Sequence, residues 1–180
     1  MILAERDRLE AEEISGNQTV RNMVSVLVSA RVTENILVAE RAGNGIPTQH
    51  PWFSGRILGC HSATDRLGAI QSVIRSSLPT AHHGIMVCPM VPPDLTQSLV
   101  VEMLQGFWRS RKNLIIPVYA GHRGYPLIIG EPMYEKMEEV SSLESLAESN
   151  ADEVHEVKFP EAHLLNSQVP ASRGSFGVHR

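Results

Sequence analysis

The segment GIMVCPMVPPDLT, residues 84–96, and the helical pattern that follows it decide the fold class. Ile85–Cys88 is an unbroken apolar run, which is typical of a strand buried on both faces inside a parallel sheet. A proline-rich turn follows this run, and Thr96 is a residue type favoured at the N-cap of a helix. Apolar residues then recur at helical spacing and predict an inward face made of Leu99, Val100, Met103, Leu104, Phe107 and Trp108.

The same alternation of strand and helix extends toward the N-terminus. Asn17 can cap a helix, and a buried strand is predicted over residues 36–39. The apolar positions of that helix are Val20, Met23, Val24, Leu27 and Val28. Another helix is predicted near Arg66–Leu78. Residues 4–13 favour a short exposed helix or turn, and the Pro-, Gly-, Ser- and His-containing stretch 46–66 is predicted to be a long surface loop.

Strands also recur toward the C-terminus. Residues 114–118 and 126–129 predict two strands joined by a turn, the second running antiparallel to the first. Ser141 and Glu144 have the spacing of a helix capping box, and residues 154–159 have the alternation of an edge strand. Together the elements predict an α/β fold, namely a three-layer α/β/α sandwich with a mostly parallel sheet and one antiparallel hairpin.

Length and composition restrict the class of protein further. The 180 residues read as one domain over 1–169, with a disordered tail over 170–180. A formal net charge of −4 argues against a nucleic-acid partner, because phosphate binding needs a basic face. No apolar run is long enough to span a membrane, and the first residues do not resemble a signal peptide. With its 2 cysteines read as reduced, the chain is expected to be cytoplasmic.

Ligands of such sheets bind beyond the carboxyl ends of the strands, which selects a few polar residues. Asp94 can reach a cleft there, or it can solvate the turn and support the helix that begins near Thr96. His122 and Arg123 can hold a phosphate or a pterin-type substrate, or they can form a solvated hairpin tip. The sequence leaves both pairs of alternatives open.

Other chemistry-bearing residues give weaker patterns. Cys60, His61 and His82–His83 do not have zinc-ligand spacing on recognisable elements, so no metal ligand is assigned. Neighbours such as Cys60 and His61 point to opposite faces of an extended chain, which argues against a catalytic pair. Trp52 and Phe53 can stack a base, meet a partner protein or anchor their loop. No catalytic residue is assigned either.

Residues 84–96 and the later stretch IPVYAGHRGYP, residues 116–126, resemble the MobA-like NTP transferases. This family includes the molybdenum-cofactor cytidylyl- and guanylyltransferases, and the resemblance extends over about residues 19–169. The family stretch Pro-Val-Tyr-x-Gly-x-Arg-Gly-His-Pro is matched by Pro117, Val118, Tyr119, Gly121, Arg123, Gly124 and Pro126. Arg75 and Leu78 match an Arg-x-x-Leu helix. The resemblance implies a nucleotidyltransferase-like, Rossmann-like sandwich whose candidate cleft residues are Arg75, Asp94, Arg123, Gly124 and Tyr125.

The departures from the family fall on the residues that carry its chemistry. The family's glycine-rich triphosphate loop is replaced by Leu3–Leu9, which contains no glycine. Its turn aspartate, which binds magnesium, falls on Val91, and a second aspartate falls on Asn166. The family histidine before the proline is Tyr125. A phosphate cradle needs backbone N–H groups that glycine leaves accessible, and magnesium prefers carboxylate ligands.

The resemblance therefore implies a nucleotidyltransferase that uses Mg²⁺ with CTP or GTP, and the departures predict weak or no catalysis. The alternative is a non-catalytic module that binds a small molecule or a protein on the same fold. A third reading is a gene product that has lost a catalytic N-terminal loop. The expected partner is a nucleotide or pterin-type small molecule, with no nucleic acid and no membrane.

Overall fold

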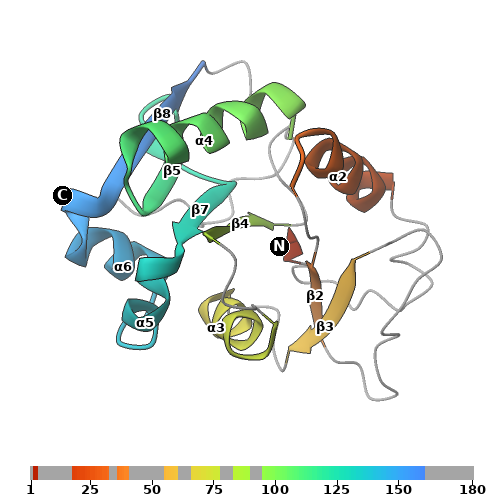
Figure 1. The fold of residues 1–180 in the computed structure, drawn as a ribbon, viewed down its shortest axis with the longest axis horizontal. Coiled ribbons are helices and arrows are strands. Elements are labelled where there is room, and N and C mark those ends of the chain that lie inside the picture. Colours follow the sequence, from red (N-terminus) through yellow and green to blue (C-terminus); the bar gives the residue numbers. More distant parts are fainter. Residues whose placement is uncertain are drawn as a thin grey trace.

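The computed structural model describes residues 2–3, 18–32, 36–40, 55–60, 66–77, 83–89 and 95–160. Within them, strands and helices alternate along the chain (Figure 1). In chain order the elements are β1 (Ile2–Leu3), α2 (Gln18–Ser29), β2 (Ile36–Glu40), β3 (Arg56–Cys60), α3 (Arg66–Ser77), β4 (Gly84–Pro89), α4 (Gln97–Ser110), β5 (Leu114–Tyr119), β6 (His122–Arg123), β7 (Leu127–Gly130), η1 (Glu131–Met133), α5 (Tyr134–Met137), α6 (Leu143–Ser149), η2 (Ala151–Glu153) and β8 (Val154–Phe159).

The strands form one mixed sheet in the order β3-β2-β1-β4-β7-β5-β6, and β8 pairs with β5. The strand β4 lies at the centre, as the sequence predicts, with β1 parallel on one side and β7 antiparallel on the other. Strand β7 returns antiparallel to β5 and is inserted between β4 and β5. The predicted α/β sandwich and its antiparallel return are confirmed, and the sheet is mixed because β7 and β6 both run against their neighbours.

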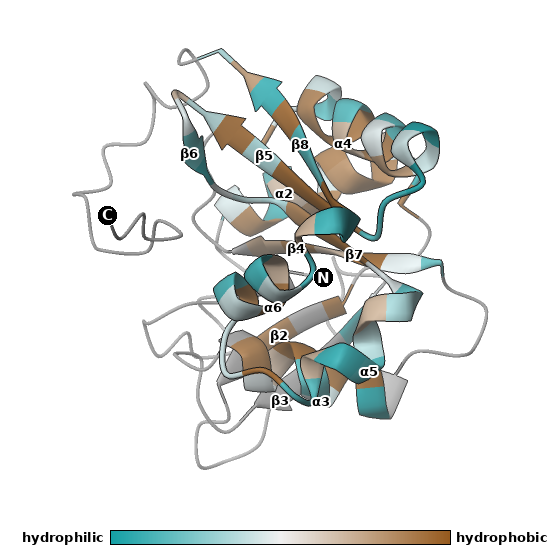
Figure 2. Ribbon diagram, turned by 90° about the vertical axis from the view of Figure 1, so that its left-hand side faces the viewer, coloured by the Kyte–Doolittle hydropathy of each residue, from teal (hydrophilic) through white to brown (hydrophobic). Residues whose placement is uncertain are grey.

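Helices cover both faces of this sheet and give the three layers. Side chains alternate along β4, so Ile85 and Val87 face one layer while Met86 and Cys88 face the other. The first layer is formed by α3, α5 and α6, and the second by α2 and α4. Figure 2 shows the same arrangement, with largely hydrophobic strands between helices that carry hydrophilic residues.

Helix α4 follows the predicted pattern at its start and departs from it at its end. The Thr96 hydroxyl accepts the Leu99 N–H at 3.3 Å and caps the helix, and Leu99, Val100 and Met103 are buried. The prediction that Trp108 points inward is wrong, because its exposed fraction is 60%. Trp108 lies in the last helical turn, against His83 at 5.4 Å between ring centroids, and so covers the start of β4 instead of the core.

Two local predictions are corrected by the structure. The stretch 46–66, expected to be a loop, contains β3, which pairs in parallel with β2 over all five residues. The capping box of α6 is formed by Ser142 and Ser145, one residue later than the spacing of Ser141 and Glu144 suggests. The short helix or turn expected over 4–13 lies outside the described residues. No helix in the ranges given above is both long and apolar enough to cross a membrane.

Candidate functional site

The candidate site lies at the carboxyl edge of the parallel strands. Leu3 in β1 is paired with Pro89 in β4, so these two strands end together, and β5 and β8 end together where Tyr119 pairs with Phe159. Ligands of open α/β sheets bind at this edge. The structure describes its β5–β6–β7 side in detail, from Tyr119 to Pro126, together with the end of β8.

The tip of this side is a tight hairpin between β5 and β6. Tyr119 is paired with His122, and the two residues between them have positive φ angles, 49° at Ala120 and 85° at Gly121. Two successive positive φ angles are typical of the turn that joins antiparallel strands through a two-residue loop. His122 is exposed and Arg123 is half-buried, so the hairpin presents both basic side chains at its surface.

Tyr119 is the anchor of this region. Its side chain is almost fully buried, and its hydroxyl donates a hydrogen bond to the backbone carbonyl of Tyr125 at 3.0 Å. Its ring stacks on Phe159 with 5.6 Å between centroids. Burial raises the pKa of the Tyr119 phenol above its ordinary range, so the group stays neutral and serves as a donor. The ring therefore ties the carboxyl ends of β5 and β8 to the segment that leads into β7.

Gly124 lets the backbone pass directly over the Tyr119 ring. Its N–H donates to the Pro117 carbonyl at 2.9 Å, and a Cβ atom at this position would lie 3.1 Å from two carbons of the ring. A larger residue would push the ring away from the Tyr125 carbonyl. Gly124 thus has a packing role in this structure, next to the candidate cleft.

Tyr125, which stands at the family's histidine position, is only 8% exposed and belongs to the core on the α3 side of the sheet. Arg123 forms an ion pair with Glu156 of β8, with Nε 2.8 Å from the carboxylate oxygen. Both partners are about one third exposed, so the pair is of the solvent-screened kind. The basic charge of Arg123, a candidate phosphate ligand, is therefore balanced by a carboxylate of its own chain.

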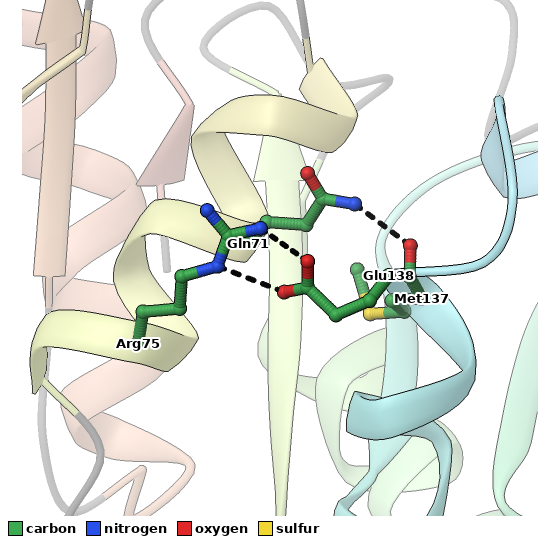
Figure 3. A network of polar contacts seen from close by, with 4 residues as sticks. All are labelled: Gln71, Arg75, Met137 and Glu138. Atoms are coloured by element: carbon green, nitrogen blue, oxygen red, sulfur yellow. Dashed lines mark hydrogen bonds and ion pairs between the residues drawn. The ribbon is translucent and has the colours of Figure 1, made fainter.

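Arg75 lies near the amino-terminal ends of the parallel strands, at the end of the sheet opposite the candidate site. It is in the last turn of α3, which leads back to the start of β4, and Gly84 at that start is paired with Gly130 at the end of β7. The segment after Gly130 supplies the partner, because two of the three side-chain nitrogens of Arg75, Nε and Nη2, donate to the two carboxylate oxygens of Glu138, with Nε at 2.9 Å (Figure 3). The structure thus keeps Arg75 apart from Arg123, Gly124 and Tyr125.

Polar contacts join α3 and α5 beside the buried apolar side chains that both helices contribute to the core. Gln71 donates from its side-chain amide to the Met137 carbonyl at 2.7 Å, one helical turn before Arg75 (Figure 3). The hydrogen bond from Arg75 lowers the pKa of the Glu138 carboxyl and raises that of the guanidinium. The Gln71 amide satisfies the Met137 carbonyl at the C-terminal end of α5, where carbonyl groups lack helical partners, and the ion pair between Arg75 and Glu138 lies beside it. It reads as a clamp between two helices.

The remaining candidates lie outside the described residues. They are Asp94 and the two family metal positions, Val91 and Asn166. Among the described residues no group of three or more His, Cys, Asp or Glu side chains could hold a metal ion. The side chains described from 119 to 125 are aromatic or basic, apart from the methyl group of Ala120 and the two glycines, and none of them is a carboxylate. An acid that contacts this hairpin, Glu156, is bound to Arg123. This donor set does not fit magnesium, which prefers several free oxygen ligands.

Cys88 near the end of β4 is a free cysteine, and it is fully buried. Burial raises the pKa of its thiol to about 11, so the sulfur is protonated at neutral pH. A protonated, enclosed thiol is a poor nucleophile. Cys88 is therefore a core residue on the α2 and α4 side of the sheet.

Replacing Tyr119 by phenylalanine tests the anchor. We expect the free energy of unfolding to fall by about 1–3 kcal/mol, because the buried Tyr125 carbonyl loses its donor. The matched control is Tyr134→Phe, since the Tyr134 hydroxyl is buried without a hydrogen-bond partner in the described structure, and its removal should be neutral or stabilising. Urea denaturation of both variants measures the difference, and equal losses would contradict the anchor role.

The sequence pattern pointed to Arg123 and Arg75 but missed their partners. Glu156 is 33 residues from Arg123 along the chain, and Glu138 is 63 residues from Arg75. Acids at such separations have no local signal. Tyr119 is part of the quoted family stretch, yet its anchoring role depends on Phe159, which only the sheet brings near.

The chain matches no protein-family model and no curated protein. Its fold is similar to that of Rv0371c from Mycobacterium tuberculosis H37Rv, with a TM-score of 0.64 at 12% identity over 88% of this chain and 86% of that one. Rv0371c has also been solved in complex with manganese. Similar too is 4-diphosphocytidyl-2C-methyl-D-erythritol synthase from Anaerococcus prevotii, with a TM-score of 0.62 at 14% identity over 87% and 85% of the chains. The chain therefore shares the α/β fold of these two proteins.

Proposed function

We propose that this chain is a nucleotidyltransferase-like protein that binds a nucleotide-type small molecule weakly and has little or no magnesium-dependent transfer activity. The observation that carries the proposal is the identity of the two residues at the family's metal positions, Val91 and Asn166. Valine offers magnesium no ligand and asparagine offers it no charge. The metal ion is what neutralises phosphate charge during nucleotidyl transfer, so its loss removes the main catalytic group.

Charge balance at the described edge supports the same proposal. A triphosphate carries several negative charges and needs cations or backbone N–H groups that are free to meet it. Arg123 is already paired with Glu156, and Arg75 is bound to Glu138 at the other edge. The N-terminal segment Leu3–Leu9 has no glycine and adds Glu5 and Asp7, which repel phosphate.

The likeness in fold supports the proposed class of ligand. The name of the similar synthase from Anaerococcus prevotii includes a diphosphocytidyl group, and Rv0371c has been solved with manganese. For this chain we propose CTP or GTP as the nucleotide and a pterin-type molecule of the molybdenum-cofactor class as the acceptor. If the chain has lost transfer altogether, the same edge serves as a non-catalytic binding module.

A thermal melting series tests the proposal. A ligand present at 100 times its Kd stabilises a protein by about 2.7 kcal/mol, and 1 kcal/mol moves the Tm of a domain of this size by about 2–4 °C. Tight binding would therefore raise the Tm by about 5–10 °C. We expect no shift beyond the scatter of replicate melts when CTP, GTP or ATP is added at 1 mM with magnesium.

The contrary result is also specific. A magnesium-dependent rise of several degrees with one nucleotide, lost in Asp94→Asn and accompanied by pyrophosphate release, would overturn the proposal and make Asp94 a metal ligand. Each melt is repeated with EDTA in place of magnesium. A rise that persists in EDTA would identify metal-independent nucleotide binding and so favour the binding module over the transferase.

A further inference from the structure

Strand β8 and helix α4 each carry one exposed acid and one exposed base. The midpoints of these two charge pairs lie close together. In the described residues β8 pairs with β5 alone, and helix α4 contacts both strands beside this edge (Figures 1 and 2). A hollow of 420 Å³ opens between helix and strand. Its lining residues are Glu102, Gln105, Gly106, Arg109, Ser110, His155 and Val157.

The first set of charges is on the strand. Glu156 and Lys158 are exposed, lie on the same face of β8 and flank Val157 symmetrically. One carboxylate oxygen of Glu156 also binds Arg123 of its own chain. If a second copy of β8 paired antiparallel with the first about Val157, Glu156 of each copy would lie directly opposite Lys158 of the other. Opposite charges at directly opposed positions stabilise an antiparallel pair.

The second set is on the helix. Glu102 and Arg109 are exposed, seven residues apart, and line the same side of α4. Their midpoint lies between Gln105 and Gly106. A Cβ atom on Gly106 would be 3.0 Å from the Val157 side chain. The midpoint between Glu102 and Arg109 therefore lies next to Val157, which is the midpoint between Glu156 and Lys158. A single two-fold axis near Val157 would therefore bring opposite charges of two copies together on both β8 and α4.

The distances between the elements also fit such an axis. Neighbouring strands are about 4.8 Å apart, so a two-fold axis midway between two copies of β8 would lie about 2.4 Å from each copy. A helix centred over the gap between β5 and β8 lies about 2.4 Å from β8 in the opposite direction. Two copies of α4 would then run about 10 Å apart, which is an ordinary interaxial distance for packed helices. Glu102 of each helix would face Arg109 of the other.

We propose that two copies of this chain associate through β8 and α4 about a two-fold axis near Val157. The association continues the sheet from one copy into the other and gives β8 a second strand partner. The four charged pairs fix the register, because a shift of the strands by two residues would place like charges opposite one another or leave them unpaired.

Sedimentation equilibrium of the full chain between 1 and 200 µM provides the test. We expect the wild type to form dimers, and Lys158→Glu to raise the dimer Kd at least about tenfold, because two like-charged pairs replace two attractive ones. Lys158→Glu leaves the ion pair between Arg123 and Glu156 in place. The matched control is Glu135→Lys, an exposed charge reversal on α5 that should leave the Kd unchanged.

Complementary charge reversals test whether the two copies associate in this register and not through another interface. Glu156→Lys alone should likewise raise the dimer Kd. An equimolar mixture of Glu156→Lys and Lys158→Glu chains should form heterodimers, since each strand pair is then complementary again. On the helix, Glu102→Arg should weaken the dimer, and adding Arg109→Glu to the same chain should restore it. Circular dichroism checks that each variant is folded. A wild type that is monomeric throughout, or variants that fail to associate when mixed, would overturn the proposal.

Discussion

Truncating Ile129 to alanine is expected to lower the free energy of unfolding by about 2–5 kcal/mol, which corresponds to a fall in Tm of about 4–20 °C. Ile129 is fully buried in the layer between the sheet and helices α3, α5 and α6. It is paired with Ile85 of β4 and with Leu114 of β5, so it joins the two halves of the sheet. The loss combines the transfer free energy of the deleted methyl groups with the cavity that remains.

Two further variants give this prediction its controls. Ile129→Val, which removes one methylene, should cost only about 0.5–1.5 kcal/mol. Val28→Ala removes an apolar side chain that is 54% exposed on α2 and should change stability by less than about 0.5 kcal/mol. Urea denaturation with an unchanged m-value measures all three. An Ile129→Ala variant as stable as Val28→Ala would contradict the central position of β7.

Gly84→Ala is expected to destabilise by about 1–3 kcal/mol or more, although it adds a single carbon. The new Cβ atom would lie 2.8 Å from the backbone carbonyl oxygen of Ile129 and 3.2 Å from the Cα atom of Gly130. Both contacts are with backbone, which cannot rotate away as a side chain does. Relief therefore requires β4 and β7 to move apart at the pairing between Gly84 and Gly130.

The contrasting variant is Gly106→Ala in α4. Its Cβ would meet only side-chain atoms of Val157 and His155, at 3.0 Å and 3.3 Å, and these side chains can shift. Alanine also favours the helix over glycine by about 1 kcal/mol, so we expect this variant to be nearly neutral or stabilised. Thermal melts of the two variants compare them directly, and equal destabilisation would show that the backbone contact at Gly84 is not the cause.

Elements with a local signal could be predicted from the sequence. The apolar run at Ile85–Cys88, the cap at Thr96 and the helical spacing from Leu99 to Met103 all lie where the structure has them. Each depends on periodicity or on a side chain bonding to backbone three residues away, and both are visible in a short window. The alternation of these elements was enough to predict the α/β sandwich.

Contacts between distant segments could not be predicted from the sequence, because they form only when the chain is folded. Strand β3 is five residues long and forms a strand because β2 supplies its partner, so the loop-like composition around it was misleading. Trp108 continues an apolar helical face, yet it lies in the last turn, where it packs on His83 and remains largely exposed. Helix propensity and patterning do not specify where a helix ends relative to the layer beneath it.

The candidate site divides in the same way. From the sequence, Val91 and Asn166 are predicted to stand where the MobA-like family has metal-binding aspartates, and both residues lie outside the described ranges. In the folded chain Arg75 lies near the amino-terminal ends of the parallel strands and Arg123 lies at their carboxyl ends, and each arginine forms an ion pair with a glutamate. A helix that links parallel strands runs back along the sheet, so its last turn ends at the edge opposite the carboxyl ends. That geometry, and ion pairs between residues far apart in the chain, exist only once the sheet has formed.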